Sequence, residues 1–324
     1  MSFHGIVAHI EHDEAVITTM QRRKKINPLV VIRIFQKYQH NPDLFEELKN
    51  QISDDRDYYD LVDLIDALPL SYHTNIMNII RSTRITNHSP YATQIMADID
   101  NTTIENYCIA PVQYQNKAIV PGIMTLLKYF SRGKTTVSFI SARPRIIERK
   151  SIQIINNLVS KQLRFTFLTG EIHHMIKYGM GRGMFSDQVV ESSYIDMAQK
   201  KYTNYLALKQ VFPYCRFIFL GDDTQGDPYL ADMLTNSSPH NFAAIRMIAG
   251  RKLPTYILQN PRIYFHTSYF ALIHVLISIG LINHTEILPM LQFEMDNQYN
   301  PMMYLCQNQV AKDMHYYKLI VNSK

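Results

Sequence analysis

The chain has 324 residues, of which 46% are hydrophobic and 19% charged, a composition typical of a globular protein with a sizeable core. Its 11 glycines and 14 prolines exclude a collagen-like or linker-dominated chain. The net charge of +5 is mild and is not gathered in a strong basic block, so we expect no binding to nucleic acid.

Cysteine usage indicates a reducing compartment. Cys108, Cys215 and Cys306 are widely spaced and odd in number, which suggests neither a disulfide framework nor a CxxC metal site. The opening "MSFHGIVAHIEHDE" lacks the apolar core of a signal peptide, so we expect a cytoplasmic protein. A composition rich in Asn, Ile, Lys and Tyr suggests an AT-rich genome, such as that of an intracellular bacterium or large virus, which leaves delivery into a host cell open.

Residues 1–90 are predicted to form a helical N-terminal extension. In "NPDLFEELKNQI", Asn41 suits an N-cap and Pro42 the first helical position. "DYYDLVDLIDALPL" has apolar residues at helical spacing as far as Pro69, which interrupts the pattern.

From residue 91 the pattern alternates between predicted strands and helices. The predicted strands are "TQIMADID" and the runs at 135–141, 164–169, 215–223 and 241–248. Helical patterns separate them, at 122–130, 145–159 and 202–212. This alternation predicts an α/β fold over residues 91–255, a Rossmann-like parallel sheet with helices on both faces.

Residues 256–324 are predicted to form a helical C-terminal region. Within it, residues 263–282 are 20 residues without a formal charge, the length of a membrane span. Histidine, serine and threonine interrupt the run, so we favour a buried helix. Contact with a membrane surface and a true span are the alternatives.

Polar side chains close three of the predicted strands. Asp98 and Asp100 end the first, Ser141 the second, and Asp222 and Asp223 the fourth. Ligands of open parallel sheets bind beyond the carboxyl ends of the strands, so these groups should converge there. Neighbouring carboxylates repel one another, and a divalent cation with oxygen ligands, above all Mg²⁺, would relieve the repulsion.

The same strand ends resemble the motifs of the haloacid dehalogenase superfamily of phosphotransferases. Its first motif, Asp-x-Asp-x-Thr after an apolar strand, is similar to Asp98, Asp100 and Thr102 in "IMADIDNTTI". Its second motif, a Ser or Thr closing a strand, is similar to Ser141 in "VSFISARP". The resemblance covers roughly residues 92–285 and implies the fold of that superfamily.

The third motif of that superfamily is a lysine, for which Lys200, Lys201 and Lys209 compete. "KYTNYLALKQVFP" resembles the stretch in which the lysine precedes a helix and then Phe-Pro, which favours Lys201.

The fourth motif, Gly-Asp followed by a further acid, is similar to "FLGDDTQGDP", which supplies Asp222, Asp223 and Asp227. The surrounding block also resembles the actin-patch type of phosphatidate phosphatases, with the pattern Gly-Asp-Ser-Gly-Gln-x-Asp-Pro. Here Asp223 and Thr224 replace Ser and Gly, which weakens the inference of a lipid substrate.

The resemblance implies a phosphatase with an aspartyl-phosphate intermediate. Asp98 would be the nucleophile, and Asp100 would protonate the leaving oxygen and then deprotonate the hydrolytic water. Ser141 and Lys201 would bind the phosphoryl oxygens.

Mg²⁺ would be held by Asp98, the Asp100 carbonyl and Asp222, with Asp223 or Asp227 acting directly or through water.

Further side chains have two interpretations each. Thr102 braces the turn after the first strand or contacts substrate, and Arg143 and Arg145 lie on the surface or bind an anionic substrate. The glycines of 178–184 indicate a loop, with a gating role as the alternative. The adjacent histidines at 173 and 174 lack an evident third metal ligand.

The predicted function is therefore hydrolysis of phosphomonoesters on a macromolecule or lipid: a phosphatidate-like lipid or a phosphoprotein, including phosphotyrosine. The alternatives are a small-metabolite phosphatase and a binding protein that has kept the fold without catalysis. Residues 1–90 or 286–324 docking to a partner or membrane is a third possibility.

Overall fold

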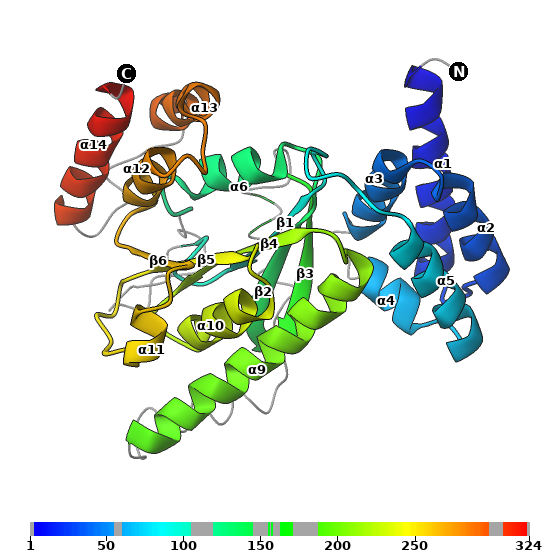
Figure 1. Ribbon diagram of the computed structural model, residues 1–324, viewed down its shortest axis with the longest axis horizontal. Coiled ribbons are helices and arrows are strands. Elements are labelled where there is room, and N and C mark those ends of the chain that lie inside the picture. Colours follow the sequence, from blue (N-terminus) through cyan, green and yellow to red (C-terminus); the bar gives the residue numbers. More distant parts are fainter. Residues whose placement is uncertain are drawn as a thin grey trace.

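The computed structural model describes residues 3–54, 60–104, 119–144, 155, 157, 163–170, 187–297 and 307–322. Its centre is a six-stranded sheet of order β3-β2-β1-β4-β5-β6, in which every pairing is parallel (Figure 1). The strands are β1 (Thr93–Asp98), β2 (Val137–Pro144), β3 (Phe165–Gly170), β4 (Arg216–Asp222), β5 (Phe242–Arg246) and β6 (Ile263–His266). The expected α/β, Rossmann-like parallel sheet with helical extensions is confirmed.

Helices cover both faces of the sheet (Figure 1). One face carries α9 (Asp187–Val211) and α10 (Asp227–Ser237), with the short α11 (Thr255–Leu258) nearby. The other carries α6 (Ile123–Ser131), α12 (Tyr269–Ser278), α13 (His284–Asn297) and α14 (Gln307–Asn322). Side chains alternate along a strand, so Met96 of β1 joins the core under α9 and α10 while Ile95 and Ala97 join the core under α6 and α12.

The segment 263–282, expected to be one buried helix, is divided in the structure. Its first four residues form β6, the edge strand next to β5, so the prediction of a helix from 263 is wrong there. The remainder forms α12, whose Ser268 side chain accepts a bond from the Phe270 amide at the N-cap. Most of the first turns of α12 are buried. Among the described helices, none combines the length and the apolarity that crossing a bilayer requires.

The expected N-terminal helices are α1 (Phe3–Arg22), α2 (Pro28–Tyr38), α3 (Pro42–Ser53), α4 (Leu61–Asp66) and α5 (Leu70–Ser82). As predicted, the Asn41 side chain caps α3, accepting from the Leu44 amide, and Pro42 occupies the first turn. The basic stretch "QRRKK" at 21–25 forms the end of α1 and the turn that follows it.

Helix α3 attaches this N-terminal layer to the amino ends of the strands. Asn50 Oδ1 accepts the Thr136 amide just before β2 at 2.8 Å, and its backbone oxygen accepts the Thr136 hydroxyl at 2.7 Å. The buried Lys49 ammonium donates to the Val211 carbonyl at the end of α9, at 2.8 Å. Asp54 accepts the Phe165 amide at the start of β3, at 2.9 Å. The layer is therefore bonded to the sheet through buried polar groups as well as apolar packing.

Replacing Asn50 with Ala should destabilise the whole protein, because the buried Thr136 amide loses its acceptor. We expect the free energy of unfolding, measured by urea denaturation, to fall by about 3 kcal/mol. Gln199→Ala on the exposed side of α9 is the control and should change it by less than about 0.5 kcal/mol. Equal small effects for both variants would contradict the assigned role of Asn50.

Candidate metal centre

Three aspartates converge at the carboxyl edge of the sheet. Asp98 ends β1, Asp222 ends the neighbouring β4, and Asp227 begins α10. Each is buried, and each offers a carboxylate oxygen such that these three atoms lie within 4.8 Å of one another. Because β1 and β4 are adjacent and parallel, with Ala97 paired to Leu220, the two strands end side by side and bring their carboxylates together.

A buried lysine completes the cluster. Lys201 extends from the middle of α9, is 2% exposed, and donates to Asp98 Oδ1 at 2.7 Å and Asp227 Oδ1 at 2.5 Å. Of the competing lysines, Lys209 lies two helical turns further along, where it donates to the Cys215 carbonyl at 3.0 Å. The geometry thus places Lys201, and not Lys209, beside Asp98.

The cluster is short of positive charge. Burial raises the pKa of Asp98 well above its usual range; Lys201 opposes this, while Asp227 and Asp222 add to it. Burial also raises the pKa of Asp222 to about 7, with Asp227 adding to the effect. Burial by itself would lower the pKa of Lys201, but Asp227 and Asp98 outweigh it and raise that pKa. With all four groups ionised, three carboxylates and one ammonium leave a net charge of −2.

The turn after β1 is held by the residues that follow Asp98. Asn101 has a positive φ of 61°, a conformation that Asn tolerates better than most residues. The Thr103 hydroxyl donates to the Asp98 carbonyl at 2.7 Å, and the Thr102 hydroxyl donates to Asp222 Oδ2 at 3.3 Å. Asp100 is partly exposed, and its charge contributes to raising the pKa of Asp98. The hydroxyl that makes a bond within the turn is thus that of Thr103, while the Thr102 hydroxyl bonds to Asp222 on the neighbouring strand.

Two glycines allow the close approach of α10 to the strand and to α9. A Cβ on Gly221 would lie 2.7 Å from Asp227 Oδ2, so a side chain there would displace the carboxylate. A Cβ on Gly226 would lie 2.3 Å from the Tyr194 carbonyl of α9. Asp222 is fixed in turn by Thr224, whose amide donates to Oδ1 at 2.6 Å and whose hydroxyl also donates to it.

Asp223 lies apart from the cluster although it follows Asp222 directly. Its Oδ1 accepts the amides of Ile248 at 2.7 Å and Ala249 at 2.8 Å, and its Oδ2 accepts that of Arg251 at 3.4 Å. Asp223 thus binds the backbone of the loop after β5. Of the two residues expected to act on the metal ion, Asp223 and Asp227, only Asp227 lies in the cluster.

The remaining predicted residues fall into two groups. Ser141 is buried and follows Ile140, the residue paired with Asp98, so it lies at the same edge of the sheet. Arg143 belongs to β2, but its side chain lies outside the described residues. So do Arg145, the histidines at 173 and 174, and the glycine-containing segment 178–184.

Two supporting residues were not predicted. Arg246 ends β5 and donates from Nη1 to the Asn101 carbonyl at 2.8 Å, and the Tyr269 hydroxyl donates to the Thr102 carbonyl at 3.2 Å. Arg246 carries the same signal as the aspartates, a charged residue closing an apolar run, and the strand-end rule would have found it. Tyr269 has no comparable signal, because it begins an apolar helix.

Comparisons with protein-family models, with curated proteins and with solved structures find no match to this chain. The donor set itself is informative: three buried carboxylates within reach of one ion, with a charge deficit of two, fit a divalent metal ion.

Lys201 and a divalent ion should stabilise the same carboxylates. We expect Lys201→Met to lower the free energy of unfolding in EDTA by roughly 3–5 kcal/mol, because it leaves buried carboxylates without their partner. Adding Mg²⁺ should then raise the melting temperature of the variant more than that of the parent protein. Lys200→Met, on the same helix, serves as the control. Identical Mg²⁺ responses in variant and parent would argue against an ion at these carboxylates.

Proposed function

We propose that the chain is a Mg²⁺-dependent phosphatase that hydrolyses phosphomonoesters through an aspartyl-phosphate on Asp98. The observation that carries this proposal is the contact of Lys201 with Asp98 and Asp227 beside Asp222, at the carboxyl edge of a parallel sheet. In the haloacid dehalogenase superfamily, which the sequence resembles, aspartates and a lysine at these motif positions carry out phosphoryl transfer. Here the fold brings such residues together from β1, β4, α9 and α10.

The nucleophile is oriented by its neighbours. Lys201 binds Asp98 Oδ1, so the attack on phosphorus is assigned to Oδ2. As the Oδ2–P bond forms and the bond from phosphorus to the leaving oxygen breaks, Asp100 donates its proton to that oxygen. Asp100 then takes a proton from water, whose oxygen attacks phosphorus, and Asp98 is released with inorganic phosphate. The partial exposure of Asp100 suits a group that must reach both substrate and water.

The charge deficit of the cluster supports a metal cofactor, for which Asp98, Asp222 and Asp227 are the protein ligands. When bound, Mg²⁺ would supply the positive charge that lets a phosphate approach a carboxylate nucleophile. Lys201 adds a positive charge beside the nucleophile, and the Ser141 hydroxyl would donate to a phosphoryl oxygen. Asp223 has no part in this proposal, because its carboxylate is occupied by three backbone amides.

For substrate we propose a phosphate carried by a macromolecule or lipid, either a phosphoprotein, including phosphotyrosine, or a phosphatidate-like lipid. The chain leaves only 16 residues, 171–186, between the end of β3 and the start of α9. A segment of that length is far below the roughly 50 residues of a small domain, which argues against a folded lid inserted at this point. Since this stretch is too short to add a separate domain, we expect a bulky phosphorylated substrate to be accepted in preference to a small metabolite.

The first test is hydrolysis of p-nitrophenyl phosphate by the parent protein and by Asp98→Asn. We expect Mg²⁺-dependent turnover that falls by roughly 10³-fold or more in the variant, because the covalent step is lost. Melting temperature should not fall, since the variant removes one of three mutually repelling charges. Asp232→Asn, on α10 but outside the cluster, should keep the parental rate.

Equal rates in the parent and Asp98→Asn would reject the phosphatase and favour a binding protein of this fold. If turnover is confirmed, phosphotyrosine peptides, phosphatidate vesicles and soluble sugar phosphates should be compared by kcat/KM. A preference for the soluble sugar phosphates would overturn the substrate assignment while leaving the mechanism in place.

A further inference from the structure

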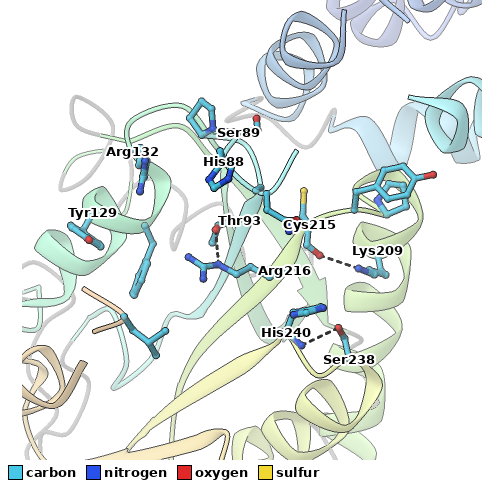
Figure 2. Close-up of a pocket in the computed structure, with 17 residues that line it drawn as sticks. His88, Ser89, Thr93, Tyr129, Arg132, Lys209, Cys215, Arg216, Ser238 and His240 are labelled. Atoms are coloured by element: carbon cyan, nitrogen blue, oxygen red, sulfur yellow. Dashed lines mark hydrogen bonds between the residues drawn. The ribbon is translucent and has the colours of Figure 1, made fainter. Parts of the chain in front are cut away.

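A polar cavity lies at the amino-terminal edge of the sheet, opposite the edge that carries the metal centre. It has a volume of about 490 Å³ and is formed by the segment before β1, the end of α6, the end of α9, the start of β4 and the turn before β5 (Figure 2). We call it the amino-edge pocket. Arg216 begins β4 within this pocket, whereas Asp222 ends the same strand in the metal centre. At roughly 3.3 Å per residue, the two sites are about 20 Å apart along the strand.

The lining of the amino-edge pocket is basic. Among the described residues, it contains no aspartate or glutamate. Its basic side chains are His88, Arg132, Lys209, Arg216 and His240. They come from five separate segments, and Figure 2 shows Arg216 reaching across the pocket towards the side where Tyr129 and Arg132 lie. Burial lowers the pKa of Arg216, and the like charge of Arg132 lowers it further.

Part of this basic lining has a structural explanation. Lys209 donates to the Cys215 carbonyl and lies over the Phe217 ring, with Nζ 5.5 Å from the ring centroid. Arg216 donates from Nε to the Thr93 hydroxyl at 2.8 Å, which fixes its stem. Neither contact neutralises a charge. In the described part of the chain, no carboxylate forms an ion pair with Arg132 or Arg216, so two neighbouring guanidinium groups remain uncompensated.

We propose that the amino-edge pocket binds a phosphate-type oxyanion between the guanidinium groups of Arg132 and Arg216. Guanidinium groups match the geometry of phosphate oxygens with paired N–H donors, and fixing Arg216 through Nε leaves its terminal nitrogens directed into the pocket. The volume is within the range of small-ligand sites, so the phosphate can carry an organic group. Tyr129 and Phe130 supply an apolar wall for such a group. The ligand is therefore a phosphorylated small molecule or a phosphate-bearing lipid headgroup.

The position of Arg132 makes a clean variant available. Arg132 has a positive φ of 49°, which asparagine adopts readily, so Arg132→Asn removes the charge without backbone strain. The test variant combines it with Arg216→Gln, whose amide can still donate towards Thr93. The control, Arg33→Gln with Lys312→Gln, removes two exposed positive charges elsewhere, so that its net charge equals that of the test variant.

The binding of inorganic phosphate should be measured by isothermal titration calorimetry in EDTA, with chloride buffers of the same ionic strength as reference. EDTA removes any divalent ion from the metal centre, and neither the test nor the control variant alters that centre, so a loss of binding in the test variant alone assigns the signal to the amino-edge pocket. We expect saturable binding to one site, weakened by at least about tenfold in the test variant and by less than about twofold in the control. Melting temperatures in chloride verify that both variants are folded.

Absence of saturable phosphate binding in the parent protein would overturn the proposal, as would an equal loss in the test and control variants. The source of the phosphate is distinguished by two further probes, glycerol 3-phosphate in solution and flotation with vesicles containing phosphatidate. Binding of glycerol 3-phosphate alone assigns a soluble phosphorylated ligand. Flotation that the test variant loses and the control keeps assigns a lipid headgroup. Neither result depends on hydrolysis at the metal centre.

Discussion

The cluster at the carboxyl edge of the sheet depends on the ion pairs of the Lys201 ammonium group with Asp98 and Asp227. The charge of this ammonium group offsets part of the cost of burying three aspartates together, since burial and the neighbouring carboxylates raise the pKa of Asp98 and of Asp222. It compensates only one of three negative charges. The fold therefore builds a cluster whose negative charges are only partly compensated by the protein, an arrangement that could hold a metal ion.

The parallel sheet places the carboxylate cluster and the basic pocket at opposite edges. All six strands run the same way, so every strand contributes its carboxyl end to one edge and its amino end to the other. Asp98 and Asp222 gather at the first edge, and Arg216 lies at the second beside Arg132. The acidic cluster and the basic pocket thus lie at the two ends of one largely buried strand, β4.

Sequence alone predicted the architecture, and the apolar runs that end in acids placed Asp98 and Asp222 at the carboxyl edge of the sheet, whereas Asp227 and Lys201 were suggested by the resemblance. It failed where that signal is weak. The four residues of β6 merge with an apolar helix, so the pattern does not separate them. Asp223 and Asp227 were both offered for one role. Successive strand residues face opposite ways, which explains why Asp223 turns to the loop after β5. The amino-edge pocket has no sequence pattern, since its cations are single residues brought together by the fold.

The bonds from α3 to the sheet have a consequence for how the chain is made. The N-terminal helices leave the ribosome first, but Asn50 Oδ1 can accept from Gln94 only after 44 further residues and from the Thr136 amide only after 86. The Val211 carbonyl, which accepts from the Lys49 ammonium, is synthesised 162 residues after Lys49. Until then the polar groups of α3 lack these long-range partners, although Glu46 already pairs with Lys49 within the helix. The bonds of this layer are completed only after residue 211 of 324 has been made, so a nascent chain halted before α9 should be a substrate for chaperones.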